Sequence, residues 1–214
     1  MIFALVRTDP AAPKHKGISY LLIDMHSPGV TVRPLVQMTG GKGFNEVFFE
    51  DVRVPVENLL GDEGSGFRYL TANLAQERLS IAIAGVAAAR GALQLTLDYV
   101  KTRTAFGQPV GSFQSARFAL AEMATEIELA TTFCDQAVLA LNAGELSPAD
   151  AAMAKWWSTE LQGRVVDRCV QLHGGYGYML EYPIARAFID ARVTRIYGGT
   201  TEIMKEIVGR SLGV

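Results

Sequence analysis

A single glutamate interrupts the apolar pattern of the stretch "FRYLTANLAQERLSIAIAGVAAARG", residues 67–91. If this stretch is helical, Glu77 shares one face with a set of apolar residues, namely Leu70, Leu74, Ile81, Ala84 and Ala88. A carboxylate there is unfavourable unless it is paired or protonated. Burial would make Glu77 a general base at the end of an apolar pocket that could receive a long hydrocarbon. The pattern alone favours a second interpretation, with Glu77 at the stripe's edge in water or beside a basic group, because charged residues are seldom fully buried.

Two glycine-rich segments lie at predicted helix ends. In "RIYGGTTEIM", Gly198 and Gly199 precede two threonines where a helix begins. Backbone N–H groups and hydroxyls at a positive helix end suit an anion or a polar ring, although ordinary capping by Thr200 or Thr201 explains the same pattern. In "VQLHGGYGYMLEYP", the glycines end a helix and also let a ligand approach the backbone closely. This second segment is not a dinucleotide fingerprint, because no strand–turn–helix spacing surrounds it.

The segment "KTRTAFGQPVGSFQ" joins two predicted helices. Arg103 could pair with a phosphate and Phe106 could stack on a ring or fill a core, but a lone arginine in a loop is more often solvated. The three histidines form no metal-type cluster, and no serine–histidine–acid set can be placed by spacing. We therefore expect no metal site.

Composition restricts the classes of protein that fit. The chain has 214 residues, a formal charge of -2 and 49% apolar residues, enough for one large domain or two modest ones. The balanced charge argues weakly against nucleic acid as the main partner. No apolar run approaches a membrane span, and the first residues lack the features of a signal peptide. Cys134 and Cys169 lie in helical patterns without metal-type spacing, so we expect reduced core residues in a cytoplasmic protein.

The hydrophobic period changes along the chain. Residues 1 to about 60 are rich in β-branched and aromatic residues with turn signals between them. The remainder predicts five helices, which we place at 66–101, 112–142, 147–173, 183–192 and 200–211. We expect a mainly α protein with an N-terminal β portion: a partial β domain over residues 1–62 and an antiparallel up-down helical bundle over 63–214. So few strands leave open sheet edges, which a preceding segment or a partner would cover.

Taken in order, six segments resemble the acyl-CoA dehydrogenase family. They are "FNEVFFEDVRVP", "LLGDEGSGF", "QERLSIA", "RTAFGQPVGSFQ", "QLHGGYGYMLEYPIAR" and "RIYGGTTEIMKEIVGRSL". The resemblance covers essentially the whole chain, from the later strands of the family's middle β domain through its C-terminal helical domain. The family's N-terminal helical domain and first middle-domain strands have no counterpart here.

The resemblance implies FAD-dependent formation of a trans double bond between Cα and Cβ of an acyl-CoA. A glutamate removes the α proton while hydride passes from Cβ to the flavin. In many members that glutamate follows the tyrosine of the last motif, where this chain has Gly198. In the long-chain and isovaleryl-type branches the base lies on the first helix of the C-terminal domain, in a stretch like "QERL", which corresponds to Glu77. The resemblance thus favours Glu77 as the base, with Gly198 leaving room for it.

Other roles follow from the same resemblance. Arg103 and Gln114 correspond to contacts with the FAD of a neighbouring subunit, and Phe106 to its adenine side. A further cofactor set corresponds to Gln171, Leu172, His173, Gly174, Gly175, Thr200, Thr201 and Glu202. Tyr197 and Gly198 would line the thioester end, with Arg78 beside the base helping to order the substrate.

The resemblance also implies partners and leaves alternatives. We expect a homodimer or homotetramer, or assembly with a related chain, and an electron-transfer flavoprotein as electron acceptor. A non-catalytic or truncated subunit that lends half of a shared FAD site is the main alternative, and an acyl-CoA oxidase or flavin monooxygenase of the same fold is a third. Arg68 and Tyr69 lie near the expected acyl tunnel, but long-chain, branched and ring-bearing acyl groups all remain open.

Overall fold

Two separate antiparallel hairpins form the β part of the chain. Strand β1 (Ile2–Arg7) pairs with β2 (Ile18–Ile23), and β3 (Val30–Leu35) pairs with β4 (Phe44–Phe49). The first hairpin is supported by helix α1 (Gly66–Ala72), because a Cβ on Gly66 would press on the backbone of Ser19 and Tyr20. Two-stranded hairpins are marginally stable alone, so the packing of α1 on β2, where Ser19 is buried, supports this hairpin.

The computed structural model describes residues 1–214, which divide into two units, Met1–Leu74 and Ala75–Val214. The expected single helix from residue 66 is in fact two helices, α1 and α2 (Leu74–Thr102), separated by Asn73. Asparagine favours such breaks because its side chain competes for backbone hydrogen bonds. The predicted domain boundary between residues 62 and 63 stays a prediction.

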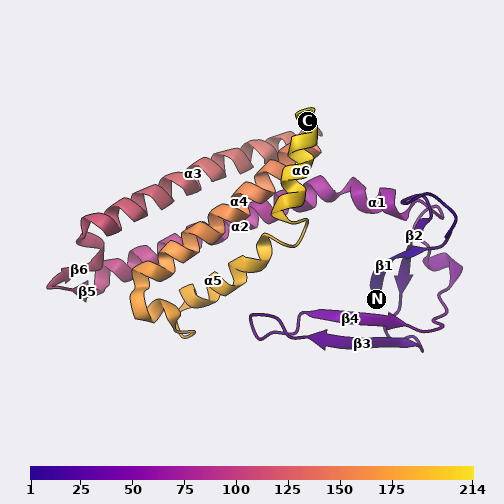
Figure 1. Ribbon diagram of the computed structural model, residues 1–214, viewed down its shortest axis with the longest axis horizontal. Helices are drawn as coiled ribbons and strands as arrows, with labels where there is room; N and C mark the ends of the chain where they lie inside the picture. The colour runs from indigo at the N-terminus through magenta and orange to yellow at the C-terminus, as the bar shows by residue number, and fades with distance from the viewer. The chain divides into compact units, whose positions relative to one another are not determined.

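The second unit is the predicted antiparallel helical bundle, built on α2, α3 (Gln114–Asn142) and α4 (Pro148–His173), with α5 (Pro183–Thr194) and α6 (Thr201–Ser211) against α4 (Figure 1). Ser147 Oγ accepts a hydrogen bond from the Asp150 N–H at the start of α4, where Pro148 occupies the first turn. Thr200 Oγ1 accepts from the Ile203 N–H at the start of α6. The predicted starts of both helices are thus confirmed, because their capping signals are local in sequence.

Short elements complete the two units. A hairpin of β5 (Thr104–Ala105) and β6 (Gln108–Pro109), which the sequence did not predict, connects α2 to α3. The 3-10 helices are η1 (Val56–Asn58), η2 (Val110–Ser112) and η3 (Gly174–Tyr178). The last of these follows α4 directly and leads towards α5.

The bundle core is formed by small and medium apolar side chains of α2, α3 and α4. Fully buried examples are Leu79, Met123 and Leu161, one from each helix. Gly85 of α2 faces the Ser158 carbonyl of α4, where an added Cβ would lie 3.3 Å from the oxygen. Small residues at such positions let the helices approach closely. In a core packed this closely, truncation of a large buried side chain to alanine is expected to lower the free energy of unfolding by about 2–5 kcal/mol.

The segment Gly66–Thr102 is long and apolar enough, by length and composition only, to cross a membrane. This corrects the expectation from the sequence that no apolar run approaches a membrane span. Many apolar residues of α2 are nevertheless buried in the bundle core, and a core helix produces the same signal.

Candidate active site

The turn between α5 and α6 is built on two consecutive glycines with positive φ. Gly198 has φ 65° and Gly199 has φ 100°, values that L side chains rarely adopt. A Cβ on Gly198 would collide with Cδ1 of Ile81, and a Cβ on Gly199 would lie 2.5 Å from Cε of Met204. The turn therefore packs against α2 at Ile81.

Glu77 lies one helical turn before Ile81, on the same face of α2. Its side chain is exposed in this chain. The expected apolar stripe through Glu77 is wrong in register, because Ala84 and Ala88 are also exposed. The buried stripe of α2 instead runs through Leu79, Ala82, Gly85, Val86, Ala89, Ala92, Leu93, Thr96 and Val100. Glu77 thus borders the core at the point where the Gly198–Gly199 turn meets α2.

Two cationic side chains lie near the turn. Lys155 of α4 is fully buried, and its Nζ donates a hydrogen bond to the Gly199 carbonyl over 2.6 Å. Burial lowers the pKa of Lys155, as does the neighbouring charge of Arg78, while Glu160 and Glu202 oppose this shift. Arg78 is partly buried with no hydrogen-bond partner for its Nε, and burial lowers its pKa against the opposing effect of Glu77.

Helix α4 also holds the two flanks of the turn. Glu160 forms an ion pair with Arg195 at 3.4 Å and accepts a hydrogen bond from Thr201 Oγ1 at 2.9 Å. The Thr201 N–H donates to the Arg195 carbonyl, which closes the turn. Gly163 leaves the space that the Arg195 guanidinium occupies. The sequence analysis did not single out Lys155, Glu160 or Arg195. The lysine within "AAMAKWW" could have been noticed, because it is a charged residue among apolar ones in a predicted helix.

The remaining predicted residues of this region lie at the start of α6. Thr200 caps the helix and Thr201 is buried, whereas Tyr197 is 41% exposed. Hydrogen bonds from its own backbone N–H and from Thr200 lower the pKa of the exposed Glu202. The structure therefore places Arg78, Tyr197, Gly198 and the start of α6 in one region around the turn.

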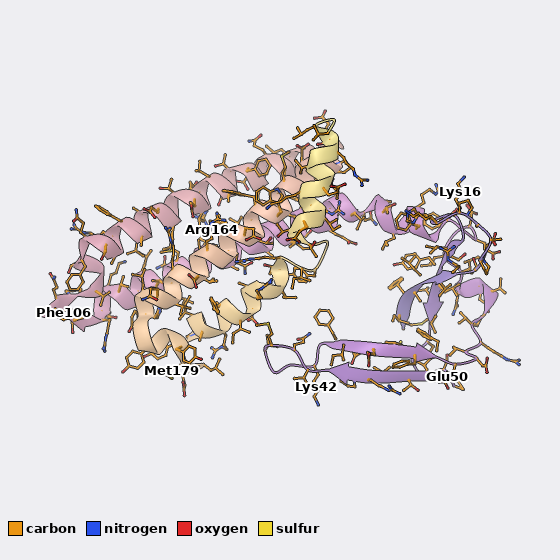
Figure 2. All side chains as sticks on the ribbon, viewed as in Figure 1. Lys16, Lys42, Glu50, Phe106, Arg164 and Met179 are labelled. Atoms are coloured by element: carbon orange, nitrogen blue, oxygen red, sulfur yellow. The ribbon has the colours of Figure 1, made fainter.

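A second site lies where α4 ends. A solvent-open pocket of about 620 Å³ is lined by the predicted residues Arg103, Gln171, Leu172, His173, Gly174 and Gly175, together with Tyr99, Val110, Tyr176 and Met179. Two predicted residues from the same loop do not line it. Phe106 is 96% exposed in the β5–β6 hairpin, with its ring 6.3 Å from that of Phe113, and Gln114 is the first residue of α3. Figure 2 labels Phe106 and Met179, which lie at the same end of the bundle.

The pocket combines aromatic rings, a guanidinium and bare backbone. His173 is buried, stacks on Tyr99 with ring centroids 4.2 Å apart, and its Nδ1 lies 2.8 Å from the Cys169 carbonyl. Tyr99 Oη donates to the His173 carbonyl, and Arg103 lies over the Tyr176 ring at 5.3 Å. An arginine fork matches phosphate oxygens, and stacked rings offer a flat apolar surface. The pocket can therefore hold a planar heterocycle carrying phosphate.

Gly174 and Gly175 differ in whether backbone conformation requires a glycine at the position. Gly174 ends α4 with φ 59°, a conformation that favours glycine. Gly175 does not have positive φ, and a Cβ placed on it would meet no atom within 4 Å. Packing within this chain therefore does not require glycine at 175, which is the pattern expected where a ligand or another chain approaches the backbone.

The turn site and the pocket lie at opposite ends of α4. Lys155 marks the turn site and His173 the pocket. With a rise of 1.5 Å per residue, the helix separates these two positions by about 27 Å. One chain therefore does not bring Thr200–Glu202 together with Arg103 and the 171–175 segment. The structure holds no group of three or more His, Cys, Asp or Glu side chains arranged to bind a metal.

Comparisons with known proteins give consistent similarities. The model of the family "Acyl-CoA dehydrogenase, C-terminal domain" matches residues 64–213. The long-chain specific acyl-CoA dehydrogenase of Sus scrofa mitochondria is 44% identical over 214 residues, which are 99% of this chain and 50% of the relative. The chain thus spans about half the length of the curated relatives it matches.

Solved structures show the same likeness. An acyl-CoA dehydrogenase from Geobacillus kaustophilus matches with a TM-score of 0.94 and 48% identity over 98% of this chain and 56% of its own. A structure described as "PigA with FAD and proline" matches with a TM-score of 0.91 and 26% identity, covering 99% of this chain and 55% of that one.

Proposed function

Because the chain belongs to the acyl-CoA dehydrogenase family, we propose that it serves in the FAD-dependent α,β-dehydrogenation of an acyl-CoA thioester to the trans-2-enoyl-CoA, with Glu77 as the base. The chain corresponds to the family's C-terminal helical domain and the strands that precede it. Bound FAD supplies the acceptor for the hydride that leaves Cβ. The chain's own residues accept the α proton and position the thioester.

The contact between Gly198 and Ile81 is the observation that carries this proposal. It places the turn one helical turn from Glu77 on the same face of α2. A base is defined by its reach to the reacting proton and not by its place in the chain. Gly198, which stands where other branches carry the carboxylate, lets the turn contact Ile81 directly, so the proposed acyl site lies within one helical turn of Glu77 on α2. The long-chain name of the Sus scrofa relative supports the same base placement.

Arg78 and Tyr197 complete the proposed acyl site. Arg78 is next to Glu77 and carries a partly buried positive charge with an unpaired Nε. A cation there would attract the thioester oxygen, on which negative charge grows as the α proton leaves. Tyr197 and Gly198 line the thioester end of this site.

The proposed FAD site is shared between two chains. Arg103 and the 171–175 segment line the pocket suited to the adenosine and pyrophosphate side, and Phe106 of the β5–β6 hairpin and Gln114 at the start of α3 complete this half of the site. Thr200, Thr201 and Glu202 follow the turn that Lys155 and Glu160 hold, positions about 20–27 Å along α4 from His173, so they would contact a different FAD. A homodimer, or a dimer of dimers, supplies both halves to each cofactor. We propose an electron-transfer flavoprotein as the acceptor that reoxidises the enzyme.

A non-catalytic or truncated subunit is the second candidate function. One observation favours it: a single copy separates the two groups of cofactor residues along α4. In that case the chain would bind FAD only with a related partner and would not reduce it alone.

Anaerobic flavin reduction by acyl-CoA tests the proposal. The enzyme containing this chain is loaded with FAD and mixed with acyl-CoAs of increasing length, while flavin absorbance and enoyl-CoA product are followed. We expect bleaching and product with ordinary acyl-CoAs, and neither with a 2,2-dimethylacyl-CoA, which has no α hydrogen. FAD bound without bleaching by any acyl-CoA would favour the non-catalytic subunit. In a separate aerobic assay, rapid oxygen consumption during turnover would instead identify an oxidase or monooxygenase.

A further inference from the structure

Lys155 is a charged residue that is fully buried. It lies in α4 among buried alanines at 151, 152 and 154, and its relative exposure is 0%. Removal of an ammonium group from water is costly unless the group is hydrogen-bonded or paired. The structure gives Lys155 one hydrogen bond, from Nζ to the Gly199 carbonyl, and no salt bridge.

We propose that Lys155 is a positioning residue for the proton abstraction assigned to Glu77, because its bond to the Gly199 carbonyl fixes the Gly198–Gly199 turn against Ile81. This inference rests on the proposed function. The turn has two residues with positive φ and contacts α2 through a residue without a side chain. Such a turn needs a contact from another element to fix its position. Lys155 of α4 provides that contact at the Gly199 carbonyl, just before the start of α6.

The flanks of the turn show that α4 is the anchoring helix. Glu160, about one turn and a half further along α4, holds Arg195 before the turn and Thr201 after it. Lys155 holds the carbonyl between them. The position of the turn relative to α2 is therefore set by three side-chain interactions with α4 and its closing backbone bond.

The electrostatic surroundings argue against a role in packing alone. Burial and the neighbouring Arg78 both lower the pKa of Lys155, and Glu160 and Glu202 oppose this shift without cancelling it. A methionine has a similar length and would fill the same volume without the cost of burying a charge, and such apolar replacements of buried charges are often neutral or stabilising. A buried lysine at this position is explained by the hydrogen bond that only a long cationic donor makes to the turn.

The variant Lys155→Met tests the inference, with Val165→Ala as the control. Val165 is also fully buried on α4 but lies about 15 Å further along the helix. In the FAD-loaded enzyme, Lys155→Met is expected to lower kcat roughly tenfold to 100-fold, as a small misplacement does, while KM for acyl-CoA and the FAD content change less than about twofold. Val165→Ala is expected to lower thermal stability without this loss of kcat.

Hydrogen–deuterium exchange gives a readout that does not depend on activity. Lys155→Met is expected to speed exchange at the Thr201 amide, which donates to the Arg195 carbonyl, whereas Val165→Ala leaves its protection unchanged. Loss of turn protection without any dehydrogenase activity in the parent would contradict the proposed function and not the anchor. Parental kcat and parental protection of the turn in Lys155→Met would overturn the inference. If the methionine variant does not fold, Lys155→Gln, which keeps an N–H donor but loses reach, is measured in the same way.

Discussion

At the scale of single residues, Ile81 links the positions of Gly198 and Glu77 in space. Gly198 contacts Ile81 directly, and Glu77 precedes Ile81 by one helical turn. The sequence predicted that these two positions belong together from family resemblance. It did not predict the exposure of Glu77, because the buried stripe of α2 is displaced from the stripe that contains it.

The variant Gly198→Ala is expected to destabilise the chain. A residue with a Cβ is strained at φ 65° by about 1–2 kcal/mol, and its methyl group would displace Ile81. We expect a loss of about 1–3 kcal/mol in the free energy of unfolding, measured by urea denaturation.

The matched control is Gly209→Ala in α6. Gly209 is helical and a Cβ there would meet no atom within 4 Å, so alanine should stabilise the chain by about 0.5–1 kcal/mol. Equal stability of Gly198→Ala and the parent would show that the turn is not constrained against α2.

At the scale of elements, helix α4 carries both candidate sites, one at each end. Its N-terminal half holds the α5–α6 turn through Lys155 and Glu160, and its last residue, His173, lines the pocket. At the pocket end, a Cβ added to Gly174 or Gly175 would meet no atom within 4 Å, so the backbone there is open.

The variant Gly175→Ala should separate cofactor binding from stability. The added methyl group has open space and no backbone strain in this chain, so thermal unfolding of the chain is expected to stay within about 0.5 kcal/mol of the parent. A ligand that approaches the bare backbone would be hindered, so FAD binding, measured by titration of flavin fluorescence, should weaken about tenfold or more. Unchanged FAD affinity would remove the 171–175 segment from the proposed cofactor site.

The elements that the sequence predicts well are those with local signals. Ser147, Pro148 and Thr200 fix helix starts through contacts within three residues, and the long alanine- and leucine-rich segments are helical as predicted. The buried side of α2 could not be predicted, because alanines lie on every face of that helix and packing with α3 and α4 selects one. The burial of Lys155 depends on a turn 44 residues further along the chain, which no local pattern contains.

At the scale of the whole molecule, the two groups of predicted cofactor residues are separated by most of the length of α4. A site that needs both groups must take them from two chains, or from this chain and a related one. These two arrangements differ in the activity expected from a mixture of variants.

Mixing two inactive variants tests the shared site. In a dimer of Glu77→Gln with Arg103→Ala chains, one site carries both defects and the other carries neither. After exchange of subunits in a 1:1 mixture, we expect about one quarter of parental dehydrogenase activity, because half of the dimers are mixed and each has one intact site. Each variant alone remains far less active.

No recovery after verified subunit exchange would show that Glu77 and Arg103 serve the same site from one chain. The exchange itself is checked with a charge tag on one variant, so that mixed dimers are counted independently of activity.

The most direct test of the central claim is single-turnover flavin reduction in the FAD-loaded Glu77→Gln enzyme. Glu128→Gln, on the exposed surface of α3, is the matched control for loss of a carboxylate. If Glu77 removes the α proton, acyl-CoA will still bind but the rate of flavin reduction will fall about 10²–10⁴-fold, while the control reduces its flavin at the parental rate. Parental reduction rates in Glu77→Gln would contradict the assignment of Glu77 as the base.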